Sequence, residues 1–325
     1  MKGRMSGSPM AGEPDRIRSF RGACLFSRMQ SYWKTLKRTV TEFVEDNVLR
    51  LSAALAYYSV FSLAPLLVIC VAVAGAFLGE EAVRGELSDQ LKSSLGASGA
   101  FAVQEMVAQA RKPEANVWVS IGGFAMLFVG ASGLFGQLQD ALNTVWGVKQ
   151  KPGRGVAGIL KDRFLSFLMV LGTGFLLLIS MVLSAVLQAM GKWVGEMADL
   201  PPEMWAVASE LASFAVVVLL FAAIFKVLPD VQVRWEHVWI GAIFTAALFV
   251  AGKSAIAWYL GREATASSYG TAGSLALVLL WVYYSSIILL FGAEFTQVWA
   301  KRQGEEIRPD RDAVAVGDPI SDNPR

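Results

Sequence analysis

Charged residues are scarce in this chain, and their scarcity excludes an ordinary water-soluble domain. Asp, Glu, Lys and Arg make up 17% of the 325 residues and apolar residues 54%, whereas soluble domains carry about 25% charged residues. The charges crowd the first 50 residues, the last 25 and a few short connections, so long apolar blocks lie between them. The net charge of +2 is too small to indicate a nucleic-acid partner. The composition predicts an all-α, polytopic membrane protein.

Cysteine and histidine are also rare. Cys24 stands in a basic tail and Cys70 in an apolar block, so no disulfide framework is expected. His237 is the one histidine, and without a His or His/carboxylate cluster the sequence predicts neither a metal site nor a cofactor. The first 50 residues contain no apolar signal-peptide core before Leu51. The first apolar block is therefore expected to be an uncleaved span.

Six segments are long and apolar enough to cross a bilayer as helices, which takes about 20 residues. They are Leu51–Leu78, Val117–Leu134, Phe164–Leu187, Trp205–Leu228, Val238–Leu260 and Gly273–Trp299. The sequence therefore predicts a membrane domain over residues 29–303 with six transmembrane helices.

The distribution of Lys and Arg predicts the orientation of these helices, because positive residues stay on the cytoplasmic side. The connection 135–163 holds five basic residues against two acidic ones. The connection 79–116 holds six acidic residues against four basic ones. Both termini are therefore expected in the cytoplasm, and residues 79–116 are expected to form an external helical hairpin.

The two tails have different predictions. Residues 1–28 mix Gly, Ser, Pro and Arg and are predicted to be a disordered basic tail, and residues 304–325 a disordered cytoplasmic tail. In residues 29–47, apolar residues such as Trp33, Val40 and Val44 recur at helical spacing, and basic residues lie between them. Two interpretations stay open for this N-terminal interfacial helix. It lies on anionic lipid headgroups, or it packs on the membrane domain.

Several motifs go beyond composition. They are Leu51-Ser-Ala-Ala-Leu-Ala-Tyr-Tyr-Ser, Gly133-Leu-Phe-Gly-Gln-Leu-Gln-Asp, Phe225-Lys-Val-Leu-Pro-Asp-Val, Ser268-Tyr-Gly-Thr-Ala-Gly-Ser and Phe291-Gly-Ala-Glu-Phe. Together they resemble the YihY/BrkB family of bacterial inner-membrane proteins over residues 30–303. The resemblance implies a multi-pass inner-membrane protein of poorly defined activity. Some members have carried a ribonuclease label, which this sequence argues against, because it lacks the clustered ligands of a metal-dependent nuclease.

Glu294 and Lys253 are the charged residues that we single out inside predicted spans, where a charge is costly and needs a reason. Glu294 lies near the cytoplasmic end of the last span. It is either a proton, cation or headgroup site, or a structural ion pair with an arginine such as Arg50, which we favour. Lys253 lies on the other side of the midplane, so we expect no direct contact between it and Glu294.

Three further groups of residues are candidates for a functional site. Pro65 is predicted to kink the first span, where Tyr57, Tyr58 and Ser62 could present hydroxyls to a cavity. The run Tyr269, Gly270, Gly273 and Ser274 allows close backbone approach or a re-entrant turn, although packing is the commoner use. Gln139, Asp140 and Asn143 are expected at the cytoplasmic mouth, either binding headgroups or capping helices.

The sequence favours a transporter or handler of a small molecule, an ion or a lipid. The alternative is a membrane scaffold that recruits envelope partners through its tails or external hairpin. An intramembrane enzyme is not expected, because no Ser/His, paired-Asp or zinc arrangement is present. Membrane lipids are the expected partners, and self-association into a homo-oligomer stays open.

Overall fold

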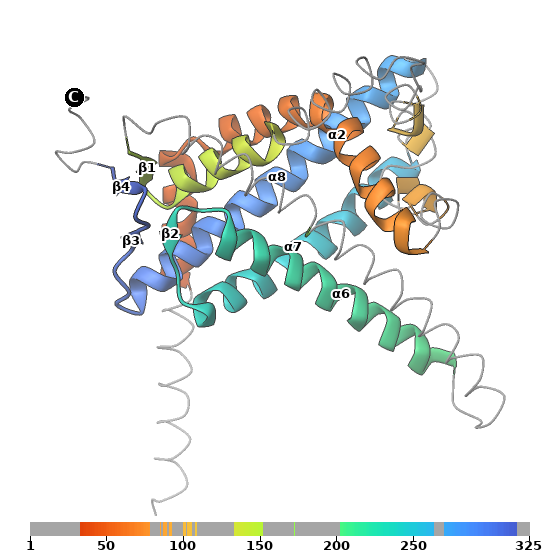
Figure 1. Ribbon diagram of the computed structural model, residues 1–325. Helices are drawn as coiled ribbons and strands as arrows, with labels where there is room; N and C mark the ends of the chain where they lie inside the picture. The colour runs from red at the N-terminus through yellow and green to blue at the C-terminus, as the bar shows by residue number, and fades with distance from the viewer. Residues whose placement is uncertain are drawn as a thin grey trace, which may run out of the picture.

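Four long helices form the body of the molecule in the computed structural model (Figure 1). The structure describes residues 33–78, 133–151, 202–262 and 270–316, together with residue 172 and scattered residues between 85 and 108. The helices are α2 (Val48–Leu78), α6 (Pro202–Val227), α7 (Trp235–Arg262) and α8 (Gly270–Arg302). α7 packs between α6 and α8, and α2 packs on the other side of α8.

The ends of these helices follow from local chemistry. α6 begins at Pro202, whose missing N–H costs nothing in a first turn. It ends before Pro229, which cannot continue a helix. α8 ends in a glycine cap: Gly304 has a φ of +81°, and Glu305 N donates to Ala300 O at 3.1 Å.

α7 and α8 touch along their backbones through two matched pairs. A Cβ at Gly241 would overlap the Thr296 side chain, and a Cβ at Gly292 would overlap that of Thr245. Each threonine hydroxyl donates to the glycine carbonyl one turn earlier on its own helix, at 2.7 Å for Thr245 and 2.6 Å for Thr296. Lipid tails are as apolar as leucine, so close packing of this kind drives helix association in membranes.

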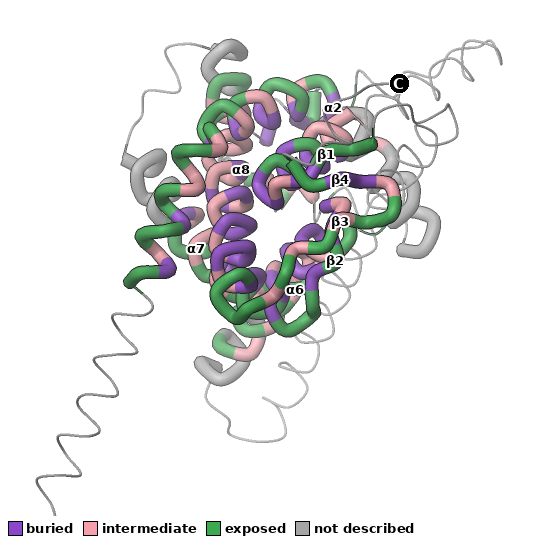
Figure 2. The backbone as a smooth tube through the Cα atoms, turned by 90° about the vertical axis from the view of Figure 1, so that its left-hand side faces the viewer, coloured by how far each residue is buried: buried purple, intermediate pink, exposed green. Residues whose placement is uncertain are grey.

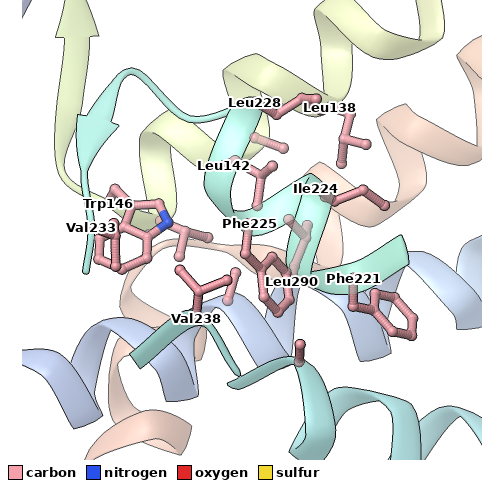
Figure 3. Close-up of a cluster of buried hydrophobic side chains, with 14 of the residues drawn as sticks. Leu138, Leu142, Trp146, Phe221, Ile224, Phe225, Leu228, Val233, Val238 and Leu290 are labelled. Carbon is pink, nitrogen blue, oxygen red and sulfur yellow. The ribbon is translucent and has the colours of Figure 1, made fainter. Parts of the chain in front are cut away.

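The buried core lies at one end of the bundle, where helical residues 133–145 meet α6, α7 and α8 (Figure 3). Leu142, Trp146, Phe225, Val238 and Leu290 are almost completely buried there.

Four short strands close the same end, which we call the strand end (Figures 1 and 2). β1 (Val148–Gln150) pairs antiparallel with β4 (Ala313–Ala315), and β2 (Val231–Gln232) pairs antiparallel with β3 (Arg308–Pro309). The all-α prediction is therefore incomplete. The prediction of a disordered tail from residue 304 is wrong for residues 304–316, because β3 and β4 have backbone partners in two distant connections.

The N-terminal helix, residues 33–45, fits both interpretations that the sequence left open. Thr35 and Thr39 are buried, and Phe43 makes an edge contact with Phe291 of α8 at 5.7 Å between ring centroids. Its opposite side leaves Trp33 69% and Val44 67% exposed. The helix packs on the bundle and still presents an apolar face of the kind that lies in a membrane interface.

Three described helical segments are long and apolar enough to cross a membrane: Glu210–Val227, Trp235–Ser254 and Leu275–Arg302. Their predicted spans are confirmed as helices, with ends shifted by up to three residues. α2 begins three residues before the first predicted span and ends with it at Leu78. The six-span count is not tested, because the second span up to residue 132 and nearly all of the third lie outside the described residues, as do residues 1–28 and 317–325.

The described residues between 85 and 108 are helical and lie at the end of the bundle opposite the strands. Gln104 Nε2 donates to Ser88 Oγ at 2.8 Å, and Val103 packs against Val278 near the start of α8. The predicted external hairpin is not tested, because most of it lies outside the described residues.

Candidate functional site

A polar cluster joins two distant segments at the strand end. Asn143 Nδ2 donates to Asp230 Oδ2 at 2.9 Å, and Gln139 Nε2 donates to Asp230 Oδ1 at 3.1 Å. Asp230 N donates back to Asn143 Oδ1 at 2.8 Å. Gln139 and Asn143 lie one turn apart on helical residues 133–145, so both amides reach one carboxylate. The arrangement favours a structural role for these two amides, which hold two distant segments together, over the binding of a lipid headgroup.

Asp140, the third residue predicted at the cytoplasmic mouth, does not take part in the hydrogen bonds to the Asp230 side chain. It is exposed, and its backbone carbonyl accepts a hydrogen bond from Thr144 Oγ1 at 2.9 Å. Gln297 of α8 was not predicted, yet its Nε2 donates to Val145 O at 2.7 Å. That bond satisfies a carbonyl at the end of helical residues 133–145, which would otherwise be orphaned.

A second cluster surrounds Glu294, which is fully buried in α8 with 0% of its surface exposed. In the described part of the chain, no N–H or O–H donor lies within hydrogen-bonding reach of its two carboxylate oxygens when the group is ionised. Its polar neighbour is another carboxyl, that of Asp46. Ionised carboxylates only accept, so a hydrogen bond between the two requires a proton on one of them.

Asp46 lies at the corner between the N-terminal helix and α2. The corner is made by Asn47, whose φ of 52° is a left-handed conformation that asparagine tolerates. Burial raises the pKa of Asp46 above its ordinary value of 3.8. The hydrogen bond with Glu294 and the charge of Lys301 lower this pKa in part, and the carboxylates of Glu42 and Glu45 raise it. The corner therefore holds a carboxyl group that keeps its proton to higher pH than usual.

The favoured ion pair of Glu294 with Arg50 does not form, because Arg50 is exposed while Glu294 is buried. Lys253 is half-buried in α7 and also stays away from Glu294. The preceding residue, Gly252, lies against Tyr284, which is ten residues before Glu294 on α8, or about 15 Å along the helix axis. Glu294 and Lys253 therefore lie at different levels along the bundle.

The residues predicted around a kinked first span divide into two groups. Ser62 is buried and lies opposite Gly133, whose Cβ position would be 3.5 Å from Ser62 Oγ. Tyr57 and Tyr58 are 62% and 44% exposed and stack edge to face on each other, with centroids 5.9 Å apart. Both side chains therefore face outward from the part of the bundle that the structure describes. Pro65 lies within α2, whose ribbon changes direction between its two halves (Figure 1).

The glycine run that precedes the last predicted span is helical. Gly270, Gly273 and Ser274 form the first turn of α8, so the re-entrant interpretation is wrong for them, whereas Tyr269 lies outside the described residues. The close backbone approach of α8 occurs further along, at Gly292.

A third contact fixes residues beyond α8. His237 Nε2 lies 2.6 Å from Glu305 Oε2, with both side chains largely buried. Glu305 Oε1 also accepts a hydrogen bond from Arg234 N at 3.2 Å. The single histidine is thus engaged by a carboxylate of the segment predicted to be a tail. Among the described residues, no three His, Cys, Asp or Glu side chains gather as a metal ion would require.

The residues that sequence reasoning missed are Asp46, Asp230, Gln297 and Glu305. Asp230 stands in the quoted Leu-Pro-Asp-Val motif, and Asp46-Asn47 interrupts the apolar pattern just before the first span. These two sequence features point to Asp230 and Asp46, but neither shows which residue each aspartate contacts.

Known proteins match most of this chain. The family model described as virulence factor BrkB matches residues 39–316. A UPF0761 membrane protein of Verminephrobacter eiseniae is 30% identical over 81% of this chain and 62% of its own length. Another, of Stenotrophomonas maltophilia, is 28% identical over 79% of this chain and 59% of its own length. The chain therefore spans about three fifths of the length of these curated relatives. No solved structure matches it.

Proposed function

This chain belongs to the BrkB virulence-factor family, and from that premise we propose that it transports or handles a small molecule, an ion or a lipid in the bacterial inner membrane. In this proposal the chain has six spans, both termini lie in the cytoplasm, and it performs no enzymatic reaction. The strand end is then the cytoplasmic end of the bundle.

The observation that carries the proposal is the carboxyl pair of Glu294 and Asp46. A membrane helix that buries an ionisable group without a cationic partner loses stability, so such groups are retained where they serve a pathway. A pair that shares one proton can release it when a cation or a conformational change separates the two carboxyls. The pair also lies at the mouth of the bundle, within reach of the water side.

The position of Lys253 agrees with a transport pathway that has two charged sites at different levels along the bundle. It lies about 15 Å further along the bundle than Glu294, so the two charges do not neutralise each other. The closely packed Gly241–Thr296 and Gly292–Thr245 pairs, at the depth of Glu294, keep α7 and α8 together beside it.

The test is complementation of a strain that lacks the gene. Glu294→Gln and Asp46→Asn remove the exchangeable proton with little change in volume, and Glu306→Gln is the control, since Glu306 is an exposed carboxyl beyond the end of α8. We expect the first two variants, expressed at wild-type level, to fail in restoring uptake, efflux or envelope integrity, and Glu306→Gln to restore them.

Full complementation by Glu294→Gln and Asp46→Asn would remove the main support for transport. If deletion of residues 80–112 then abolished function, the scaffold alternative would replace it. Deletion of residues 304–316 does not discriminate, because those residues are part of the strand end.

A further inference from the structure

A pocket lies between the N-terminal helix and the last turns of α8, apart from the carboxyl pair. Its volume is about 450 Å³, within the usual range for small-ligand sites. Its polar walls are Lys34, Thr35, Arg38 and Glu42 from the N-terminal helix and Lys301 and Arg302 from α8.

The charge of this pocket is strongly positive, with four cationic side chains against one carboxylate. Glu42 accepts a hydrogen bond from Arg38 Nε at 2.7 Å, so the single carboxylate is engaged within the pocket wall. The carbonyl end of α8 adds about half a negative charge through the helix dipole, too little to offset the net of three positive charges. The pocket therefore favours an anion.

The guanidinium group of Arg302 is held in a defined place. Arg302 Nη1 donates to Thr35 Oγ1 at 2.7 Å, and the guanidinium carbon lies 5.8 Å from the centroid of the Trp299 ring. A positioned planar guanidinium beside lysine ammonium groups matches the tetrahedral oxygens of a phosphate better than a single carboxylate.

With Leu275–Arg302 as a transmembrane segment, the pocket would lie at the level of the lipid phosphates. The apolar segment Leu275–Arg302 ends at its wall, and Trp33 at the start of the N-terminal helix is exposed. Tryptophan with lysine and arginine at the end of a span is typical of the headgroup region.

We propose that this pocket binds a phosphate group, carried either by an anionic glycerophospholipid or by a soluble phosphate ester. Neither Glu294 nor Asp46 lines the pocket, although its residues Glu42 and Lys301 also act on the charge of Asp46. Phosphate binding is measured independently of the proposed transport function. It assigns a specific ligand class to the N-terminal helix.

The experiment uses the full chain in neutral detergent, with two kinds of probe. Native mass spectrometry counts bound phosphatidylglycerol, with zwitterionic phosphatidylcholine for comparison. Calorimetry measures binding of glycerol 1-phosphate and of inorganic phosphate. The variant is Lys34→Gln with Lys301→Gln, two exposed positions, and the control is Lys37→Gln, an exposed lysine of the same helix outside the pocket.

We expect the double variant to weaken phosphate binding at least about tenfold, as for loss of a charge-assisted hydrogen bond. Lys37→Gln and Glu294→Gln should leave it within about twofold. Binding of the lipid alone identifies a headgroup site, and binding of the soluble probes alone identifies a soluble ester. The proposal is overturned if no probe binds the wild type, or if a correctly folded Lys34→Gln, Lys301→Gln variant binds as the wild type does. If the complementation test contradicts the transport proposal, the phosphate-site proposal is unaffected.

Discussion

Asn143 and Asp230 hold each other through two hydrogen bonds. Asn143 Nδ2 donates to the Asp230 carboxylate at 2.9 Å, and Asp230 N donates to Asn143 Oδ1 at 2.8 Å. The two residues are 87 positions apart, and Asp230 O in turn accepts from Asp310 N at 2.8 Å. One asparagine thus connects helical residues 133–145, the connection after α6 and the segment that follows α8.

We expect Asn143→Ala to lower the free energy of unfolding by about 1–3 kcal/mol, because Asp230 loses the donor to its Oδ2 and the acceptor of its backbone N–H. Gln139 still donates to Asp230 Oδ1 in this variant. In a double-mutant cycle with Asp230→Ala, the double variant should lose less stability than the sum of the two single losses. Thermal unfolding in detergent measures both. Thr144→Ala is the control, since its exposed hydroxyl bonds only within its own helix. Additive losses in the cycle would show that the pair is not coupled.

Gly241→Ala should destabilise the α7–α8 contact by about 1–3 kcal/mol, as overpacking does. The new Cβ would overlap Thr296 Oγ1 and lie 2.8 Å from Thr296 Cβ. Combining it with Thr296→Gly should recover part of the loss. Gly172→Ala is the control, because no atom of the described residues lies within 4 Å of that Cβ position. Equal melting temperatures for Gly241→Ala and Gly172→Ala would contradict the close approach.

Asp46 should make the folded protein less stable as pH rises. Its folded pKa is raised above the ordinary 3.8, so the protonated form favours the folded state. That contribution is complete below pH 3.8 and is lost as pH rises through the raised pKa. Asp46→Asn should therefore reduce the fall in melting temperature above pH 3.8, whereas Glu306→Gln, at an exposed position, should not. An unchanged fall in Asp46→Asn would refute the assignment.

The proposed orientation is testable with reporter fusions along the chain. Fusions at residues 95, 195 and 264 should be external, and fusions at 150, 232 and 316 should be internal, because lysine and arginine collect on the internal side. Internal signals at the first three positions would overturn both the six-span topology and the cytoplasmic placement of the strand end.

The long helices are predictable because one physical requirement, an apolar run that can cross lipid, acts on each segment alone. The ends of α6, α7 and α8 follow to within three residues. Residues 304–316 were missed for the opposite reason. Their composition is typical of disorder, and they are ordered only because Val231, Gln232 and residues 148–150 lie where β3 and β4 can pair with them.

The site was predictable only in part. Glu294, Gln139 and Asn143 were singled out from burial cost and spacing, and all three are buried. Their partners were not found, because Asp46 and Asp230 are polar residues in short connections whose spatial neighbours depend on the packed bundle. Arg50 was the wrong partner for Glu294, since it points to the outside from the first turn of α2.

The central claim is that Glu294 and Asp46 share a proton inside the strand end of the bundle. Infrared spectroscopy of the purified chain tests it directly, because a protonated carboxyl has a C=O stretch distinct from that of a carboxylate. We predict a protonated carboxyl band at neutral pH that is lost or shifted in Glu294→Gln and in Asp46→Asn and is unchanged in Glu306→Gln. A wild-type spectrum without this band, or one that both variants leave unchanged, would contradict the account.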